Sequence, residues 1–210
     1  MILSILTILA VFSGLLHIHA DYRQKIYQTY IFKPLTIVLI ILIAFIQTAE
    51  VSSVYRYLII AGLFFALAGD IFLMLPSDRF LSGLSCFLVT HVFYILAFIS
   101  GSSFPVGYIY LIPGLVLSAV FLKILLPHAG SKTVPVIIYS LILVFLLWQA
   151  AGRMDEIFSY SSIIALIGTI LFVFSDVILA YNRIVKKFRS AQFIILSTYY
   201  LAQLGIACSV

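Results

Sequence analysis

The sequence predicts an all-α membrane protein with eight transmembrane helices. Of the 210 residues, 64% are hydrophobic and only 9% are charged. The hydrophobic residues form repeated runs of about 20, the length that a helix rising about 1.5 Å per residue needs to cross a bilayer. The runs do not alternate in the way barrel strands do, so the backbone must satisfy its hydrogen bonds within helices.

Eight apolar spans follow one another with short loops between them, so residues 1–210 are expected to form a single integral-membrane domain. The expected spans are 1–20, 29–49, 54–75, 79–100, 106–126, 131–150, 160–181 and 190–209. No Lys or Arg precedes the first span, which is atypical of a signal peptide, so this span is expected to remain as a helix. Cys86 and Cys208 both lie in apolar spans and are expected to be free thiols.

The basic residues predict the orientation. The loops after the first, third, fifth and seventh spans hold ten of them, namely Arg23, Lys25, Lys33, Arg79, Lys123, Lys132, Arg183, Lys186, Lys187 and Arg189. The other loops hold only Arg56 and Arg153. Basic loops stay in the cytoplasm, so both termini are expected on the opposite side. The net charge of +5 therefore indicates topology, and no nucleic-acid partner is expected.

Two spans each carry one carboxylate inside an apolar run. The run 61–75, AGLFFALAGDIFLML, contains Asp70, and the run 167–181, IGTILFVFSDVILAY, contains Asp176. The two runs align without a gap at an offset of 106 residues. An ionisable residue at such a position costs about 3 kcal/mol on insertion scales. Because this occurs twice, at matching positions, the aspartate pair is the candidate functional site.

The offset also predicts an internal repeat. Four helices separate the two copies, so both point the same way and residues 1–105 and 106–210 form two parallel four-helix repeats. Each aspartate is expected five or six residues from a cytoplasmic helix end, about 8 Å along the axis. Two carboxyls at one depth, one protonated and one ionised, form an acid–base pair. The alternative is a pair of buried structural carboxylates.

Other polar residues are expected to surround the aspartates. Lys33 is either an interfacial anchor or a ligand for an anionic head group. Arg183 lies seven residues after Asp176, hence on the same helix face, and is either a phosphate ligand or a topology signal. Buried Tyr, His and Gln side chains often join helices by hydrogen bonds. The residues expected to form such a polar lining are His91 with Tyr94, Gln203 with either Tyr199 or Tyr200, and Tyr139. Three further histidines at span ends are expected at the interface, namely His17, His19 and His128.

These features resemble the YhhN-type lysoplasmalogenases, a family of multi-pass membrane enzymes. The resemblance rests on the order and spacing of short motifs from the second span to the eighth. The motifs are Lys33-Pro34, Gly69-Asp70, His91 with Tyr94, Ser175-Asp176, Asn182-Arg183 and the closing run 198–203, TYYLAQ. Family membership implies hydrolysis of the vinyl ether bond of lysoplasmalogens, giving a fatty aldehyde and glycerophosphoethanolamine or glycerophosphocholine.

The resemblance also implies roles for individual residues. Asp70 and Asp176 would be catalytic, without metal or cofactor. The substrate pocket would be lined by Lys33, His91, Tyr94, Tyr139, Asn182, Arg183, Tyr199, Tyr200 and Gln203. The expected partners are the lysophospholipid substrate and membrane lipid, and the oligomeric state stays open.

The chemistry agrees with a pair of buried carboxyls. A vinyl ether is cleaved by protonation of carbon, which gives an oxocarbenium ion that water then attacks. This reaction needs a general acid and a carboxylate that stabilises the cation, as glycoside hydrolysis does. The sequence contains no CxxC, HExxH, Walker or GxSxG motif.

Three other functions remain as alternatives. A proton-coupled secondary transporter also has parallel repeats and buried carboxylates. An intramembrane aspartyl protease uses two membrane aspartates, but Leu67 stands where a GxGD motif has glycine, and there is no Pro-Ala-Leu motif. A scaffolding protein would leave the aspartate pair unexplained.

Overall fold

The protein is described by a computed structural model that covers residues 1–47, 51–77, 79–100, 102 and 107–210. All regular secondary structure in these residues is helical, as the sequence predicts. The α-helices are α1 (Ile2–Tyr22), α2 (Ile26–Ile46), α3 (Ser53–Met74), α4 (Phe80–Ser100), α5 (Leu111–Ala129), α6 (Thr133–Glu156), α7 (Tyr160–Ile184) and α8 (Ala191–Cys208). Two short 3₁₀ helices flank α5, η1 (Tyr108–Tyr110) and η2 (Gly130–Lys132).

Seven segments of the described chain are long and apolar enough to cross a membrane. One of them, Tyr108–Glu156, has 49 residues and contains both α5 and α6. The chain is therefore a multi-pass membrane protein. Eight separate crossings, and the side of the membrane on which each terminus lies, stay predictions.

Several helix ends differ from the expected span ends. Helix α2 begins three residues before residue 29, and α6 continues to Glu156 rather than to residue 150. The expected end at residue 49 and the expected start at residue 106 lie outside the described residues. Hydrophobic runs mark the hydrocarbon core, whereas backbone hydrogen bonding carries a helix on into the polar interface.

The expected distance of the aspartates from the helix ends was wrong, because α7 continues past its expected end and α3 stops one residue short of its own. Helix α7 runs to Ile184, so Asp176 lies eight residues before its end and Arg183 belongs to its last turn. Asp70 lies four residues before the end of α3 at Met74. The positions of the helix ends therefore do not show whether Asp70 and Asp176 lie at the same depth in the membrane. Their relative depth depends on how α3 and α7 pack.

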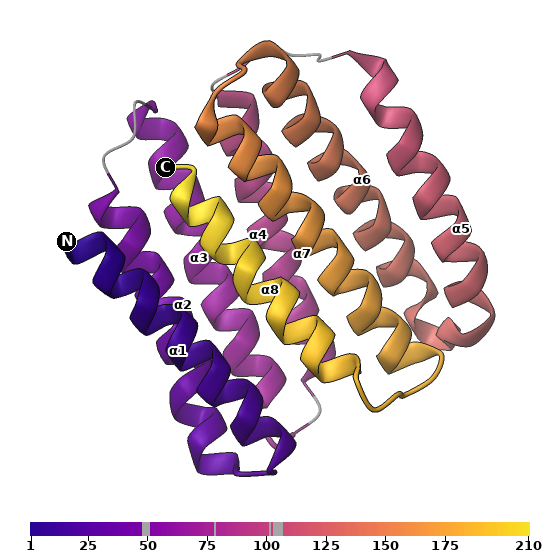
Figure 1. The fold of residues 1–210 in the computed structure, drawn as a ribbon. Helices are drawn as coiled ribbons and strands as arrows, with labels where there is room; N and C mark the ends of the chain where they lie inside the picture. The colour runs from indigo at the N-terminus through magenta and orange to yellow at the C-terminus, as the bar shows by residue number, and fades with distance from the viewer. Residues whose placement is uncertain (48–50, 78, 101, 103–106) are drawn as a thin grey trace.

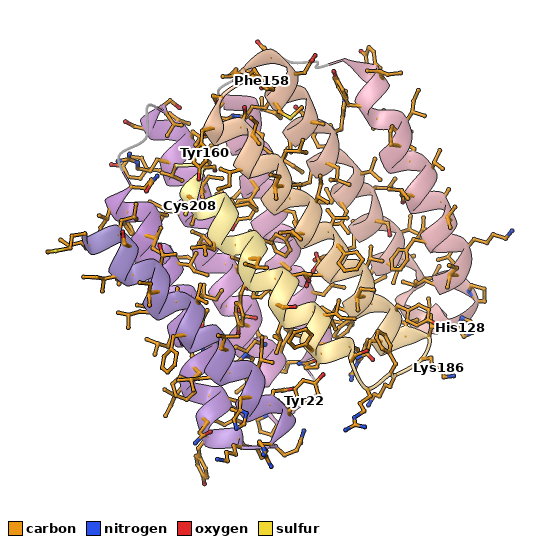
Figure 2. The ribbon with its side chains drawn as sticks, viewed as in Figure 1. Tyr22, His128, Phe158, Tyr160, Lys186 and Cys208 are labelled. Carbon is orange, nitrogen blue, oxygen red and sulfur yellow. The ribbon has the colours of Figure 1, made fainter. Side chains whose placement is uncertain are left out.

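The helices run up and down, each antiparallel to the one before it in the chain (Figure 1). Figure 2 shows Tyr22, His128 and Lys186 towards one end, and Phe158, Tyr160 and Cys208 towards the other. The connections after α1, α5 and α7 thus share an end, the one for which the sequence predicts a cytoplasmic location.

Helix pairs pack in the same scheme in both halves of the chain. The most extensive contacts join α1 to α2, α3 to α4, α5 to α6 and α7 to α8. Helix α4 also contacts α6, and the corresponding helix α8 contacts α2. Helix α5 lies at one edge of the bundle (Figure 1). This scheme fits two parallel repeats, although duplication itself stays a prediction.

Two glycines at the repeat offset allow close helix contacts. A Cβ atom on Gly62 of α3 would lie 2.4 Å from Cε1 of Tyr94 on α4. A Cβ atom on Gly168 of α7 would lie 2.9 Å from the carbonyl oxygen of Ala202 on α8. Each aspartate helix is therefore packed closely against its neighbour about two turns from the carboxylate.

Candidate functional site

Asp70 is buried on α3, with 2% of its surface exposed, and both of its carboxylate oxygens have partners. Lys33 Nζ of α2 lies 3.3 Å from Oδ1. The phenol of Tyr199 of α8 donates a hydrogen bond of 2.8 Å to Oδ2. Lys33 is itself 7% exposed, so it does not extend to the interface as an anchor would. A charged donor on one oxygen and a phenol on the other suit an ionised carboxylate.

Asp176 is buried on α7, with 6% of its surface exposed, in a different environment. The phenol of Tyr139 of α6 donates a hydrogen bond of 2.7 Å to Oδ2. His91 Nε2 of α4 lies 3.3 Å from the same oxygen. Both described partners of Asp176 therefore reach Oδ2, and neither is a Lys or Arg.

Both aspartates line one cavity of about 280 Å³, which we call the polar cavity. Its lining comes from five helices and the loop after α7. The polar or charged lining residues are Lys33, Asp70, Ser175, Asp176, Asn182, Arg183, Lys187, Gln192 and Tyr199. A second cavity, of about 310 Å³, lies at the α3–α4 connection and shares Leu73, Phe80 and Arg183 with the polar cavity. Helices distant in the sequence thus bring the two carboxyls to a single site.

Five predicted lining residues do not line the polar cavity: His91 and Tyr139 lie behind Asp176, and the other three are engaged elsewhere. Tyr94 donates a hydrogen bond of 2.6 Å to Oε1 of Gln203, joining α4 to α8. Tyr200 is hydrogen-bonded to Nδ1 of His17 at 2.7 Å. His17 is only 1% exposed, so the expectation that it lies at the interface was wrong. The roles proposed for Tyr94, Tyr200 and Gln203 in substrate binding stay predictions.

Residues at the end of α7 form the rim of the polar cavity. Asn182 Oδ1 accepts a hydrogen bond from the backbone N–H of Phe188, which folds the loop back onto the helix. The Arg183 guanidinium stacks over the ring of Phe80, 5.1 Å from its centroid. Arg183 is nevertheless exposed and lines both cavities, so it can reach an anionic group at the rim.

Three lining residues were not predicted from the sequence as ligands. Ser175 donates a hydrogen bond to the carbonyl oxygen of Ile195, which joins α7 to α8 beside Asp176. In the sequence Lys187 is one of the ten basic residues that predict orientation, and Gln192 is an uncharged residue near the start of its span. Gln192 lies seven residues before Tyr199, and therefore on the same face of α8, which is the signal that could have identified it.

The described residues contain no group of three or more His, Cys, Asp or Glu side chains placed to hold a metal ion. What the polar cavity offers is two carboxyls in unlike environments. A cation and a phenol hold Asp70, whereas a phenol and an imidazole contact Asp176. Two carboxyls in such different environments can act as a proton donor and a carboxylate towards an uncharged substrate.

Fold and site together define a multi-pass helical membrane protein with a buried polar cavity built around two aspartates. The model of the YhhN family matches residues 28–210, so the chain belongs to the YhhN family. The match covers α3, α4, α6, α7 and α8 and nearly all of α2, which include every residue that contacts an aspartate.

Relatives occur in bacteria and mammals. The chain is 26% identical over 188 residues to the uncharacterized membrane protein YhhN of Escherichia coli O6:H1, covering 90% of this chain and 89% of the relative. It is 30% identical over 174 residues to human lysoplasmalogenase TMEM86B, covering 80% of this chain and 70% of the relative. It is 31% identical over 159 residues to human lysoplasmalogenase TMEM86A, covering 72% of this chain and 64% of the relative. No solved structure matches the chain.

Proposed function

We propose that this protein is a membrane hydrolase that cleaves the vinyl ether bond of lysoplasmalogens. The observation that carries the proposal is the polar cavity, which two buried aspartates line together. The names of the mammalian relatives support the substrate class. The products are a fatty aldehyde and glycerophosphoethanolamine or glycerophosphocholine.

The unlike contacts of the aspartates suggest which carboxyl is the acid. Both oxygens of Asp70 receive donors, and Lys33 balances its charge, so Asp70 is the ionised partner. The described contacts of Asp176 occupy Oδ2, which leaves Oδ1 to carry the proton. Asp176 is therefore assigned as the general acid, and Lys33 as a positioning residue for Asp70.

The reaction begins when Asp176 donates its proton to the vinyl carbon that is not bonded to oxygen. The C=C electrons form the new C–H bond, and the adjacent carbon becomes an oxocarbenium ion that the charge of Asp70 stabilises. Water adds to this carbon and gives a proton to Asp70, forming a hemiacetal. The hemiacetal collapses as its hydroxyl proton passes to the glycerol oxygen, and the C–O bond breaks. Exchange with water returns Asp176 to the acid form and Asp70 to the carboxylate.

The head group belongs at the rim of the polar cavity. Arg183 and Lys187 line this rim, and an Arg side chain binds phosphate through two parallel hydrogen bonds. Arg183 lies seven residues beyond Asp176, about 10 Å along α7. That separation suits a bound lysolipid whose phosphate is at the rim and whose vinyl ether is at the aspartates. With the predicted eight crossings, the rim faces the cytoplasm.

One assay tests the proposal. Purified protein in detergent is incubated with a lysoplasmalogen and, separately, with the matching ester lysophospholipid, and the products are identified by mass spectrometry. We expect aldehyde from the vinyl ether and no cleavage of the ester. Intact vinyl ether, together with uptake of a solute in proteoliposomes, would instead favour the proton-coupled transporter.

A further inference from the structure

A long apolar groove lies on the side of Asp176 away from the rim. It has a volume of about 670 Å³ and runs between α5, α6 and α7; we call it the α5–α7 groove. Its described lining is apolar apart from three side-chain hydroxyls, those of Tyr110, Ser118 and Ser140. No charged side chain lines it among the described residues, so it is suited to hydrocarbon and not to a polar solute.

A small cavity lies between the α5–α7 groove and the polar cavity and shares lining residues with both. A cavity of about 30 Å³ has Phe80, Asp176 and Leu179 in common with the polar cavity. The same small cavity has Phe121, Ser140 and Leu143 in common with the α5–α7 groove. Asp176 therefore stands between a polar compartment and an apolar one. This small cavity has room for about two water molecules, so a chain that extends through it requires some of its lining side chains to move.

We infer that the α5–α7 groove binds the single hydrocarbon chain of the lysolipid while its vinyl ether lies at the aspartates. This inference rests on the proposed function and names the part of the protein that recognises the chain. The order of the compartments matches the order of groups in the substrate. Arg183 at the rim meets the phosphate, Asp70 and Asp176 meet the vinyl ether, and the groove receives the chain.

The length of the α5–α7 groove agrees with this assignment. On α7 its lining runs from Val177, next to Asp176, back to Leu166. Eleven residues of helix span about 17 Å, close to half of the roughly 30 Å hydrocarbon thickness of a bilayer, which is the reach of one lipid chain. A second groove, of about 150 Å³ between α1, α2 and α8, has no described lining residue in common with the polar cavity.

Two isoleucines on α7 provide a matched test. Ile170 lines the α5–α7 groove and Ile167 does not, and they are 50% and 52% exposed. We would measure kcat/KM in detergent for lysoplasmalogens with hexadecenyl and octenyl chains. Ile170→Trp is expected to lower the ratio of long-chain to short-chain kcat/KM about tenfold, because the indole overfills the middle of the groove. Ile167→Trp is expected to leave the ratio at the wild-type value. Equal ratios in the two variants would overturn the inference while leaving the vinyl ether activity established.

A binding experiment on the unmodified chain does not depend on turnover. The probe is an alkyl-ether lysophospholipid with a diazirine in its chain, which the protein cannot hydrolyse. After irradiation, we expect cross-links in α5, α6 and α7 that excess lysolipid suppresses. Cross-links in α1, α2 and α8, or cross-links that excess lysolipid leaves unchanged, would overturn the inference. Suppressible cross-links in the groove of a protein that leaves vinyl ethers intact would retain the chain site and reject only the proposed hydrolysis.

Discussion

Lys33 and Tyr139 hold equivalent positions in the two halves of the protein, and each contacts the aspartate of its own half. They are 106 residues apart, as are Asp70 and Asp176. Lys33 places an ammonium 3.3 Å from Asp70, whereas Tyr139 donates a phenolic hydrogen bond of 2.7 Å to Asp176. The two halves thus present one carboxyl beside a cation and one beside a neutral donor, which is the asymmetry that the proposed mechanism uses.

The first prediction concerns the aspartates. Asp70→Asn and Asp176→Asn keep the volume of the side chain, so both variants are expected to fold. Each is expected to lose turnover, with removal of the general acid alone costing about 10²- to 10⁴-fold. Single-turnover assays on folded protein, checked by gel filtration, measure the loss. A folded variant with near-normal turnover removes that aspartate from the mechanism.

The second prediction compares the two equivalent partners. Lys33→Met leaves Asp70 buried without its cation, a change that costs about 3–5 kcal/mol in other buried pairs. Lys33→Met is therefore expected to melt well below wild type, and adding Asp70→Asn is expected to restore most of the loss. Tyr139→Phe removes the hydrogen bond that stabilises the carboxylate of Asp176 as the proton leaves. Such a bond to a charged group is worth about 1.5–3 kcal/mol, so turnover is expected to slow about 10- to 100-fold.

Thermal melts of Lys33→Met and of the double variant in one detergent, together with the turnover of Tyr139→Phe, provide the comparison. If the double variant melts at as low a temperature as Lys33→Met, the unpaired charge of Asp70 is not the cause of the lost stability.

The third prediction concerns the rim of the polar cavity. Arg183→Lys keeps the charge but loses the two-point hydrogen bonding to phosphate. Its KM for a lysoplasmalogen is expected to rise nearly as much as that of Arg183→Gln, with kcat less affected. Michaelis constants for the two variants and the wild type measure this. Wild-type constants in both would place the phosphate at another residue of the rim, with Lys187 the next to test.

The fourth prediction concerns helix packing. Gly168→Ala places a methyl group against the backbone of α8, and the resulting strain is expected to cost about 1–3 kcal/mol. Gly205→Ala on α8 is the matched control, because its Cβ atom would lie 3.5 Å from Cα of Gly168, an ordinary contact. The melting temperature of purified protein is expected to fall for Gly168→Ala and to stay near wild type for Gly205→Ala. Equal melting temperatures would contradict the packing argument.

The fifth prediction concerns orientation and follows from the ten-to-two distribution of basic residues. Reporter fusions after His128 and Lys187 are expected to report cytoplasm, and fusions near Ser52 and Asp155 the opposite side. A fusion at Lys187 that reports the far side would reverse the side on which the rim of the polar cavity opens.

The sequence was sufficient to predict the helical class and the approximate helix positions, because apolar runs of membrane length have one structural solution. It also singled out Asp70 and Asp176 as the candidate site, because an isolated carboxylate is conspicuous in an apolar helix; the structure places both on one cavity, and their role in function stays a prediction. Exact helix ends were not predictable, since α6 and α7 continue past their apolar runs into polar residues.

All four observed partners were among the residues expected to surround the aspartates, but which residue contacts which aspartate could not be predicted from the sequence. Tyr199 and Asp70 are 129 residues apart, and Tyr200 turns to His17 instead of to the polar cavity. In a soluble helix the apolar stripe shows which face is buried, but these helices are apolar on the lipid side as well as the inner side. Which of the two neighbouring tyrosines faces Asp70 therefore depends on how α8 is rotated about its own axis. The spacing of apolar residues in the sequence does not specify that rotation.

The position of Asp176, between a polar compartment and an apolar groove, has a consequence for how turnover ends. Under the proposed binding mode, cleavage produces two molecules of opposite solubility, each already in the compartment that suits it. The glycerophospho product diffuses out past Arg183 into water, and the aldehyde slides sideways into the bilayer, because the groove wall at Leu117 is 65% exposed. Departure by two separate exits keeps a reactive aldehyde in the lipid phase and leaves the rim free for the next head group.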